Sequence, residues 1–531
     1  MENESRQQWN AIRGIGRVGA LRRLCSFNRA NIPPAKRAAT SQREVPTKVE
    51  FMKSHITRYI LSLAIGGILF GNPCAPFLCQ AADQGSAPAK PPSAGLVNDW
   101  LRREAPAASA WDLGGQFRVR YEVKENAGSF PNRDFLSGLD NSNEYFLFRT
   151  KAHLGWSPVG WFNAFVQGRD AQAVSDNRPV TETDTFDLHQ AFLRFGDPKQ
   201  FPLSLKVGRQ ELLYGDERFA GISDWSNFGR SFDAVKLRFE NELFWADAFT
   251  GRLVLARDDH FNVANDYDWF SGVYASTRKL APWQDTDLFF LARNVEAHSP
   301  TAITPTLGGP GPRDIYTVGT RWKSVPDKLG NWDYAFEAVG QFGGINSSGA
   351  RLDHQAFAVN ATGGYTWKSA SGAPRLALGY DFGSGDGNPR DGKNETFEPL
   401  FGTNHRLYGL MDVFGSRNMH IPRLSGSIKP AQDMTVTLDW LGFWMADTAD
   451  FLYPEAGAGR SQNGYGRNPG FSSAVGHELD LVLNWRAASW GQLQAGYGHF
   501  FAGQYIRQSA AAGGRSTDDA DWVYLQTTFS F

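Results

Sequence analysis

Apolar and polar residues alternate along much of the chain beyond residue 113. In the segment Phe117–Lys124 (FRVRYEVK), every odd position is apolar and every even position is charged. The same two-residue period returns at 146–156, 434–440 and 478–486. Because successive side chains of a strand point to opposite faces, this period predicts β-strands with one apolar and one polar face.

About eighteen such segments can be counted, each near the 9–11 residues or more that a tilted membrane-spanning strand needs. They begin near residues 114, 144, 161, 185, 203, 232, 243, 268, 286, 314, 331, 352, 373, 418, 433, 475, 490 and 519. Short turns alternate with long polar loops, of which the longest cover 125–143, 215–231, 257–267, 385–405 and 446–474. This organisation predicts an all-β fold, a single antiparallel transmembrane β-barrel of about eighteen strands.

The aromatic residues favour a membrane barrel over a soluble β-sandwich. Trp156, Trp322 and Trp490 lie near predicted strand ends, where aromatic girdles of outer-membrane barrels meet the two membrane interfaces. The last predicted strand alternates and carries Phe529 and the terminal Phe531. This ending resembles the C-terminal signal that the barrel assembly machinery recognises. We therefore expect that machinery, and the lipids of the bacterial outer membrane, to be partners of the chain.

An apolar run near the N-terminus predicts a signal peptide. The run Tyr59–Phe70 is shorter than the 18–20 residues that a membrane-spanning helix requires. Lys53 and Arg58 form a basic region around its start, and small residues follow it as far as Ala81. These features predict a signal peptide over 52–81 with cleavage near Ala81.

The signal peptide divides the chain into four parts. Residues 1–51 are interpreted as an upstream extension or the product of a misplaced start codon. Residues 82–113 are rich in Ala, Pro and Ser and predict a periplasmic lead-in with a helical turn around Leu96–Arg103. Residues 114–531 form the predicted barrel.

Composition and motifs narrow the classes of function. The three cysteines, at positions 25, 74 and 79, precede the cleavage point, so the mature chain is predicted to have no disulfide. Lys and Arg number 54 against 55 Asp and Glu, which does not suit a nucleic-acid partner. The ten histidines show no zinc-ligand spacing, and no serine stands in a nucleophile motif. We therefore expect no metal, no other cofactor and no catalytic residue.

Two stretches resemble the bacterial alginate export family. Residues 207–238 read VGRQELLYGDERFAGISDWSNFGRSFDAVKLR, and residues 380–412 read YDFGSGDGNPRDGKNETFEPLFGTNHRLYGLMD. The strands that contain QFRVRYE, YFLFRTKAHLG and DLHQAFLRFG are similar to this family too, so the resemblance covers nearly all of the mature chain. It implies a monomeric eighteen-stranded barrel whose arginine-rich lumen conducts an acidic polysaccharide. Substrate identity does not follow from the fold, so the polymer itself stays open.

Strand parity predicts a charged lumen. A cation facing lipid would cost about 2–4 kcal/mol at mid-membrane, so cations on the strands should point inward. The expected pore-lining cations are Arg118, Arg120, Arg149, Lys151, Arg169, Arg194 and Arg293, with Arg209, Arg218 and Arg230 from the family-like segment. The carboxylates expected in the same interior are Glu122, Asp170, Asp187, Glu211, Asp233, Glu337 and Asp381. Each cation could equally be part of a structural ion pair in a wet barrel.

These features predict a passive, anion-selective outer-membrane channel for an acidic, alginate-like polysaccharide. Arginine suits this task because it stays charged and its planar fork can bind carboxylate with two hydrogen bonds. The alternative is a general porin for anions or oligosaccharides, and an outer-membrane barrel enzyme is the weaker alternative. The expected partners are the polysaccharide and periplasmic export proteins.

Overall fold

The computed structural model describes residues 95–127, 130–175, 182–198, 200–258, 260–300, 311–347 and 350–531. The chain divides into two compact units, Met1–Cys74 and Ala75–Phe531, and all described residues belong to the second. The predicted signal peptide, its cleavage at Ala81 and the extension 1–51 lie outside the described residues.

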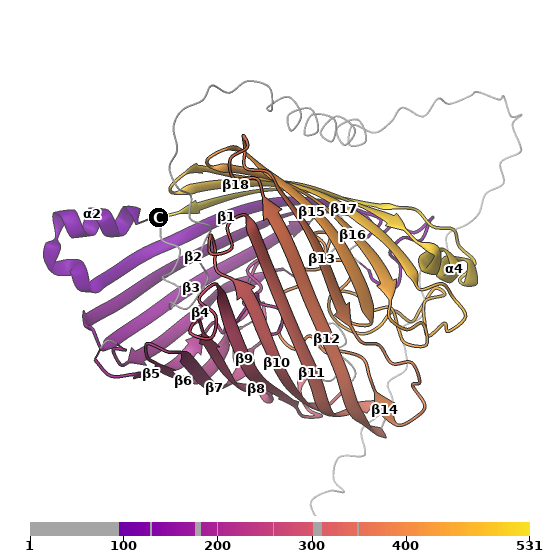
Figure 1. Ribbon diagram of the computed structural model, residues 1–531, viewed down its shortest axis with the longest axis horizontal. Coiled ribbons are helices and arrows are strands. Elements are labelled where there is room, and N and C mark those ends of the chain that lie inside the picture. Colours follow the sequence, from indigo (N-terminus) through magenta and orange to yellow (C-terminus); the bar gives the residue numbers. More distant parts are fainter. Residues whose placement is uncertain are drawn as a thin grey trace, which may run out of the picture. The chain divides into compact units, whose positions relative to one another are not determined.

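The described residues form a closed antiparallel β-barrel of eighteen long strands (Figure 1). The long strands are β1 (Trp111–Glu125), β2 (Asn143–Val159), β3 (Phe162–Ser175), β4 (Asp184–Phe195), β5 (Leu203–Gln210), β6 (Phe232–Glu240), β7 (Trp245–Val254), β8 (Ala264–Thr277), β9 (Gln284–Val295), β10 (Arg313–Ser324), β11 (Trp332–Ser347), β12 (Ala350–Thr366), β13 (Arg375–Gly383), β15 (Met419–Ala431), β16 (Met434–Met445), β17 (Ala474–Ala488), β18 (Gly491–Ala502) and β19 (Ala520–Ser530). The two-residue strand β14 (Lys393–Asn394) pairs in parallel with β12, while β13 pairs directly with β15. Every predicted strand start lies within four residues of an observed one, so the predicted barrel is confirmed.

Three short helical segments accompany the strands. Helix α2 (Leu96–Glu104) and the 3-10 helix η1 (Pro106–Ala110) lead into β1, and α4 (Gln504–Ala512) lies between β18 and β19. The helical turn predicted around Leu96–Arg103 is confirmed as α2. Within the part of the chain that the structure describes, no helix is both long enough and apolar enough to cross a membrane.

Side-chain exposure alternates along the strands as the sequence period predicts. On β2, Phe146, Leu154 and Trp156 are exposed on the outer surface, whereas Arg149 and Lys151 are buried on the inner one. The apolar outer face suits lipid, and the polar inner face suits a lumen. Long loops lie at one rim and short turns at the other, so the turns and both ends of the barrel chain belong to the periplasmic side.

Pairing of the first strand with the last closes the barrel. β1 and β19 run antiparallel with Val123 opposite Val523 and Gln116 opposite Ser530. The backbone N–H of Gly115 donates to the carbonyl of Phe531 at 3.0 Å, and that of Phe531 donates back at 3.0 Å. The last residue of the chain therefore completes the seam.

The extracellular loops fold into the barrel and give it a packed interior. One apolar cluster joins 211–231 and 384–418 to the inner faces of β6 to β12. A second joins 126–142, 384–418, 446–473 and α4 to the inner faces of β15 to β19. We call residues 211–231 the first inner loop and residues 384–418 the second inner loop.

We predict that Gly115→Ala destabilises the barrel by about 1–3 kcal/mol, as overpacking commonly does. A Cβ atom at Gly115 would contact the Phe531 ring and lie 2.6 Å from the carbonyl oxygen of Lys151. The unfolding midpoint in urea, measured in lipid vesicles, should fall. Gly340→Ala is the matched control, because a Cβ there meets nothing within 4 Å. Equal midpoints for the two variants would contradict this account of the seam.

Candidate functional site

Three buried cations from β1 and β2 hold the first inner loop. Arg118 donates to the carbonyl of Asp224 at 2.7 Å and to that of Trp225 at 3.1 Å. Arg149 donates to the same Asp224 carbonyl at 2.9 Å, and Lys151 lies 3.2 Å from the Asp224 carboxylate. Burial by itself raises the pKa of Asp224, but the charges of Arg149, Lys151 and Arg118 hold this pKa well below its ordinary value. These cations bind the loop and are not free to meet a solute.

Trp225 at the tip of this loop lies between two planar groups. The Arg120 guanidinium carbon is 3.6 Å from the ring centroid of Trp225, and the His405 ring stacks on Trp225 at 3.7 Å and 5°. Two groups this close to one centroid must occupy opposite faces of the ring. Arg120 also pairs with Glu122 at 2.7 Å. The stack thus connects β1, the first inner loop and the second inner loop.

Backbone hydrogen bonds join the two inner loops. The N–H of Gly221 donates to the carbonyl of Phe401 at 2.9 Å, and the N–H of Phe401 donates to Phe219 at 3.1 Å. Arg230 donates to the carbonyls of Gly221 and Phe401. The two loops therefore form one structure inside the lumen.

Most of the other predicted charges form ion pairs around these loops. Arg218 lies 2.9 Å from Asp381 and 3.8 Å from Glu337, and Arg293 lies 2.9 Å from Asp268. Arg169 pairs with Asp184, and His189 forms a hydrogen bond with Glu211 at 2.8 Å. All of them are largely buried, so the structural interpretation fits them better than a transport role.

Three predicted lumenal residues lie elsewhere. Asp170 follows the inward Arg169 directly, so its side chain points to the opposite face. Arg209 and Asp233 share the face of the exposed Val207 and Val235 and pair with each other at 2.8 Å.

Asp187 is buried beneath the loop between β7 and β8. Its carboxylate accepts the N–H of Asn262 at 2.5 Å and lies 3.7 Å from Arg209. In the register of β3 and β4, Asp187 stands opposite the inward Arg169, on the face that was expected. The expected lumenal positions of Asp170, Arg209 and Asp233 need correction, and the alternation of their own strands already decides the face.

A row of cations crosses the lumen face of β4, β5 and β6. Arg194 stands opposite Lys206, and Lys206 stands opposite Lys236. Lys236 lies 3.4 Å from Asp247, whose carboxylate also accepts from Tyr214 of the first inner loop, which places the row inside the barrel. We call these three residues the cation row.

The cation row lacks enough carboxylates to neutralise it. Lys206 lies 3.6 Å above the Phe192 ring, and in the described ranges neither Lys206 nor Arg194 forms an ion pair. Sequence reasoning missed Lys206 and Lys236, although both alternate with outward apolar residues in LSLKVGRQ and FDAVKLRFE. All three side chains of the row are partly exposed.

A group of buried titratable residues surrounds the stack at Trp225. His405 Nδ1 lies 2.8 Å from Asp412, and the side-chain amide of Asn404 donates to the Glu455 carboxyl at 3.3 Å. Burial lowers the pKa of His405 well below its ordinary value and raises those of Asp412 and Glu455 to about 8. Near neutral pH the two carboxyl groups are therefore mainly protonated, and the Asp412 hydroxyl can donate to His405.

Across the described segments, no three His, Cys, Asp or Glu side chains are arranged to hold a metal ion.

The closed barrel, its apolar exterior and its charged interior define an outer-membrane channel. The sequence profile of the alginate export family matches residues 110–519, and the chain belongs to this family. A comparison with curated proteins gives no match.

Solved structures with a similar fold come from Pseudomonas aeruginosa. OccK2 (OpdF) has a TM-score of 0.51 and 11% identity over 80% of this chain and 98% of its own. OccK2 in complex with glucuronate has a TM-score of 0.50 and 12% identity, covering 80% and 99%. The outer membrane protein OpdK has a TM-score of 0.50 and 12% identity, covering 79% and 99%.

We predict that Arg149→Met and Arg194→Met differ in their effects on stability. Arg149→Met removes buried charge-assisted hydrogen bonds to Asp224 and should lower the free energy of unfolding by about 1–3 kcal/mol. Arg194→Met removes a partly exposed cation that forms no ion pair with the described residues, and it should change the free energy of unfolding by less than about 0.5 kcal/mol. Urea unfolding in vesicles measures both, and a larger loss for Arg194→Met would contradict the assignment of Arg149 as a loop anchor.

We also predict that the second inner loop loosens between about pH 5 and about pH 9. The folded-state pKa values of Asp412 and Glu455 are raised, so the packed loop binds more protons than an opened one, and its stability falls as pH rises toward about 8. Hydrogen exchange of peptides from 384–418, corrected for intrinsic rates, should be faster at the higher pH. Asp412→Asn combined with Glu455→Gln should abolish the difference. An unchanged pH effect in that double variant would assign it to other groups.

Proposed function

We propose that the chain is a passive, anion-selective channel for an acidic polysaccharide of the alginate type. The cation row of Arg194, Lys206 and Lys236 carries this proposal. Like charges directly opposite each other on neighbouring strands are destabilising unless a counter-charge is present. Asp247 supplies one carboxylate and shares it with Arg238 at 2.6 Å. A passing anion would supply the remaining negative charge.

The spacing of the row suits a polymer better than a single ion. Neighbouring strands lie about 4.8 Å apart, so three adjacent strands span about 10 Å. Successive sugars of a polyuronate each carry a carboxylate and can meet successive cations along this line. Partial exposure keeps each contact weak, because water competes for both partners. Weak contacts at several positions let an anion enter without being trapped.

The second candidate is a porin for small anions. The inner loops meet each other inside the lumen, and this contact narrows the space for a solute. OccK2, a protein of similar fold, has been solved in complex with glucuronate, a single uronate sugar. A monomeric uronate would use the same cation row as a polyuronate. Family membership and a channel-forming fold indicate transport rather than catalysis.

We predict that replacing all three cations of the row by Gln lowers the anion-to-cation permeability ratio several-fold. The reversal potential across a planar bilayer in a KCl gradient measures this ratio, preferably at low salt, where screening is weakest. The matched control replaces three exposed lysines of the periplasmic turns and the rim, Lys279, Lys328 and Lys429, by Gln. An unchanged ratio in the row variant would contradict the proposal.

The same bilayers separate polymer from small-anion transport. Addition of polymannuronate should block the current of the unmodified channel, and a neutral dextran of equal length should block it less. Glucuronate permeation without block by the polymer would favour the small-anion porin.

A further inference from the structure

Helix α2 has one apolar and one polar side. Leu96, Val97, Trp100 and Leu101 recur at the spacing that gathers residues on one side of a helix. The other side carries the polar residues Asn98, Asp99, Arg102 and Arg103. Leu96 is 46% exposed and Trp100 is 53% exposed. The Trp100 indole is thus available to contact an apolar surface outside the protein.

One polar residue of α2, Asn98, faces the barrel, whereas the charged side chains of Asp99, Arg102, Arg103 and Glu104 are exposed. The Asn98 amide donates to Asp112 at 2.5 Å and accepts the N–H of Leu113 at 2.8 Å, and Asn98 is buried. These bonds fix the helix to the start of β1 by one side. They leave Leu96 and Trp100 on a side that faces away from this attachment.

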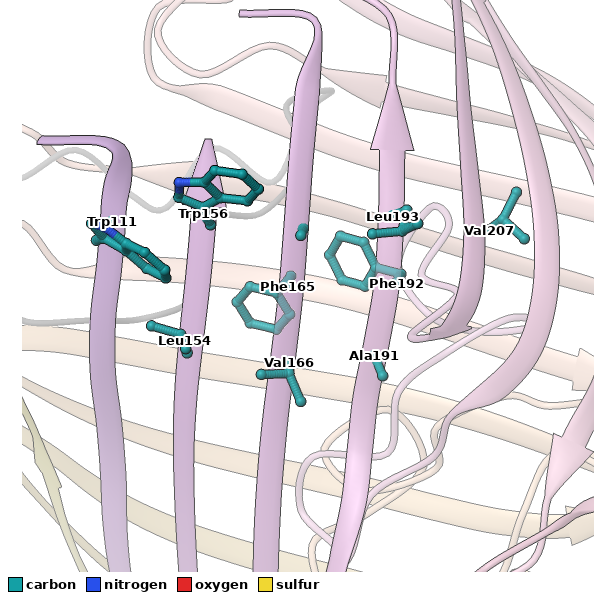
Figure 2. A pocket seen from close by; sticks show the side chains of 10 residues that line it. Trp111, Leu154, Trp156, Phe165, Val166, Ala191, Phe192, Leu193 and Val207 are labelled. Carbon is teal, nitrogen blue, oxygen red and sulfur yellow. The ribbon is translucent and has the colours of Figure 1, made fainter. Parts of the chain in front are cut away.

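The strand that follows α2 and η1 begins in the apolar outer surface of the barrel. Trp111, the first residue of β1, is exposed and stacks on Trp156 of β2 at 5.9 Å. The two indoles border an apolar groove on the barrel wall that also contains Leu154 and Leu193 (Figure 2). Ala105 and η1 separate α2 from Trp111, and the five residues of 3-10 helix span about 10 Å.

The helix carries no net charge. Asp99 lies 4.0 Å from Arg102, and Arg103 lies 3.2 Å from Glu104. Electrostatic attraction to anionic lipid would therefore add little, and burial of apolar surface would dominate. Two exposed side chains on a nine-residue helix also offer far less than the roughly 800 Å² per partner of a stable protein interface.

We propose that α2 lies in the headgroup region of the periplasmic leaflet of the outer membrane, with Leu96 and Trp100 inserted toward the acyl chains. Amphipathic helices with Trp and Leu on one side bind lipid surfaces in this way. The helix then holds the start of β1 at the membrane, four residues before the Gly115–Phe531 pair that closes the seam. This inference is independent of the solute that the channel carries.

Site-specific fluorescence tests the proposal. The only cysteines of the full chain are Cys25, Cys74 and Cys79, so their replacement by Ser gives a background for single labels. Leu96→Cys carries the test label and Asp99→Cys carries the control label, each with an environment-sensitive dye. The folded protein is inserted into phosphatidylcholine vesicles that contain a nitroxide-labelled lipid.

The label at position 96 should be quenched several-fold more than the label at position 99. Added anionic lipid or salt should leave the difference unchanged. Trp100→Asp should reduce quenching at position 96 while channel conductance stays the same, which distinguishes loss of lipid contact from misfolding of the barrel. Equally weak quenching at both positions would overturn the proposal and indicate water or a periplasmic protein around α2.

Discussion

The structure depends on one constraint, which is that lipid offers no partner for backbone N–H and C=O groups. A sheet that spans a membrane must therefore leave no free edge. The chain meets this requirement by pairing β1 with β19 along ten residue pairs and by a further pair of hydrogen bonds between Gly115 and Phe531. Once the sheet is closed, each strand has one face toward lipid and one toward the interior. The two-residue period of the sequence follows from that geometry.

Closure of eighteen strands creates a second problem, because the interior is too wide for strand side chains alone to fill. The inner loops occupy this space and bring backbone carbonyls with them. Arg118 and Arg149 provide hydrogen-bond donors to these carbonyls, and Arg120 covers one face of the Trp225 ring. One arginine side chain can donate hydrogen bonds to several buried carbonyl oxygens at once, since a guanidinium carries five N–H groups. Much of the arginine content therefore serves to pack the interior.

The fold could be predicted closely from the sequence, because the constraint that shapes it acts on each residue locally. Phe117–Lys124 shows the period without interruption, and its inward Arg118, Arg120 and Glu122 are placed as expected. The period of LSLKVGRQ also places Lys206 inward and Arg209 outward. The sequence alone therefore contained the correct face for both residues. Arg209 was expected in the lumen because it belongs to the family-like segment, whereas the alternation of its own strand places it on the outer face.

The contacts inside the lumen could not be predicted in this way. Trp225 stacks on His405 across 180 positions of sequence, and no local pattern encodes such a pair. The register shift between Gln167 and Gly168, opposite β4, is a second example. A single inserted residue changes the face of every later side chain in a strand, and no residue type marks it reliably.

The interior thus contains two kinds of cation, and burial separates them. Arg149 is nearly inaccessible and bound to a loop carbonyl, so a solute would have to displace a protein partner to reach it. Lys206 and Arg194 are partly exposed and have no carboxylate partner in the described interior, so an anion can approach them without breaking a protein contact. Selectivity in a conducting pore requires charge that remains available after folding. For this reason we propose that any anion selection would come from the cation row, whereas the larger set of buried arginines holds the inner loops in place.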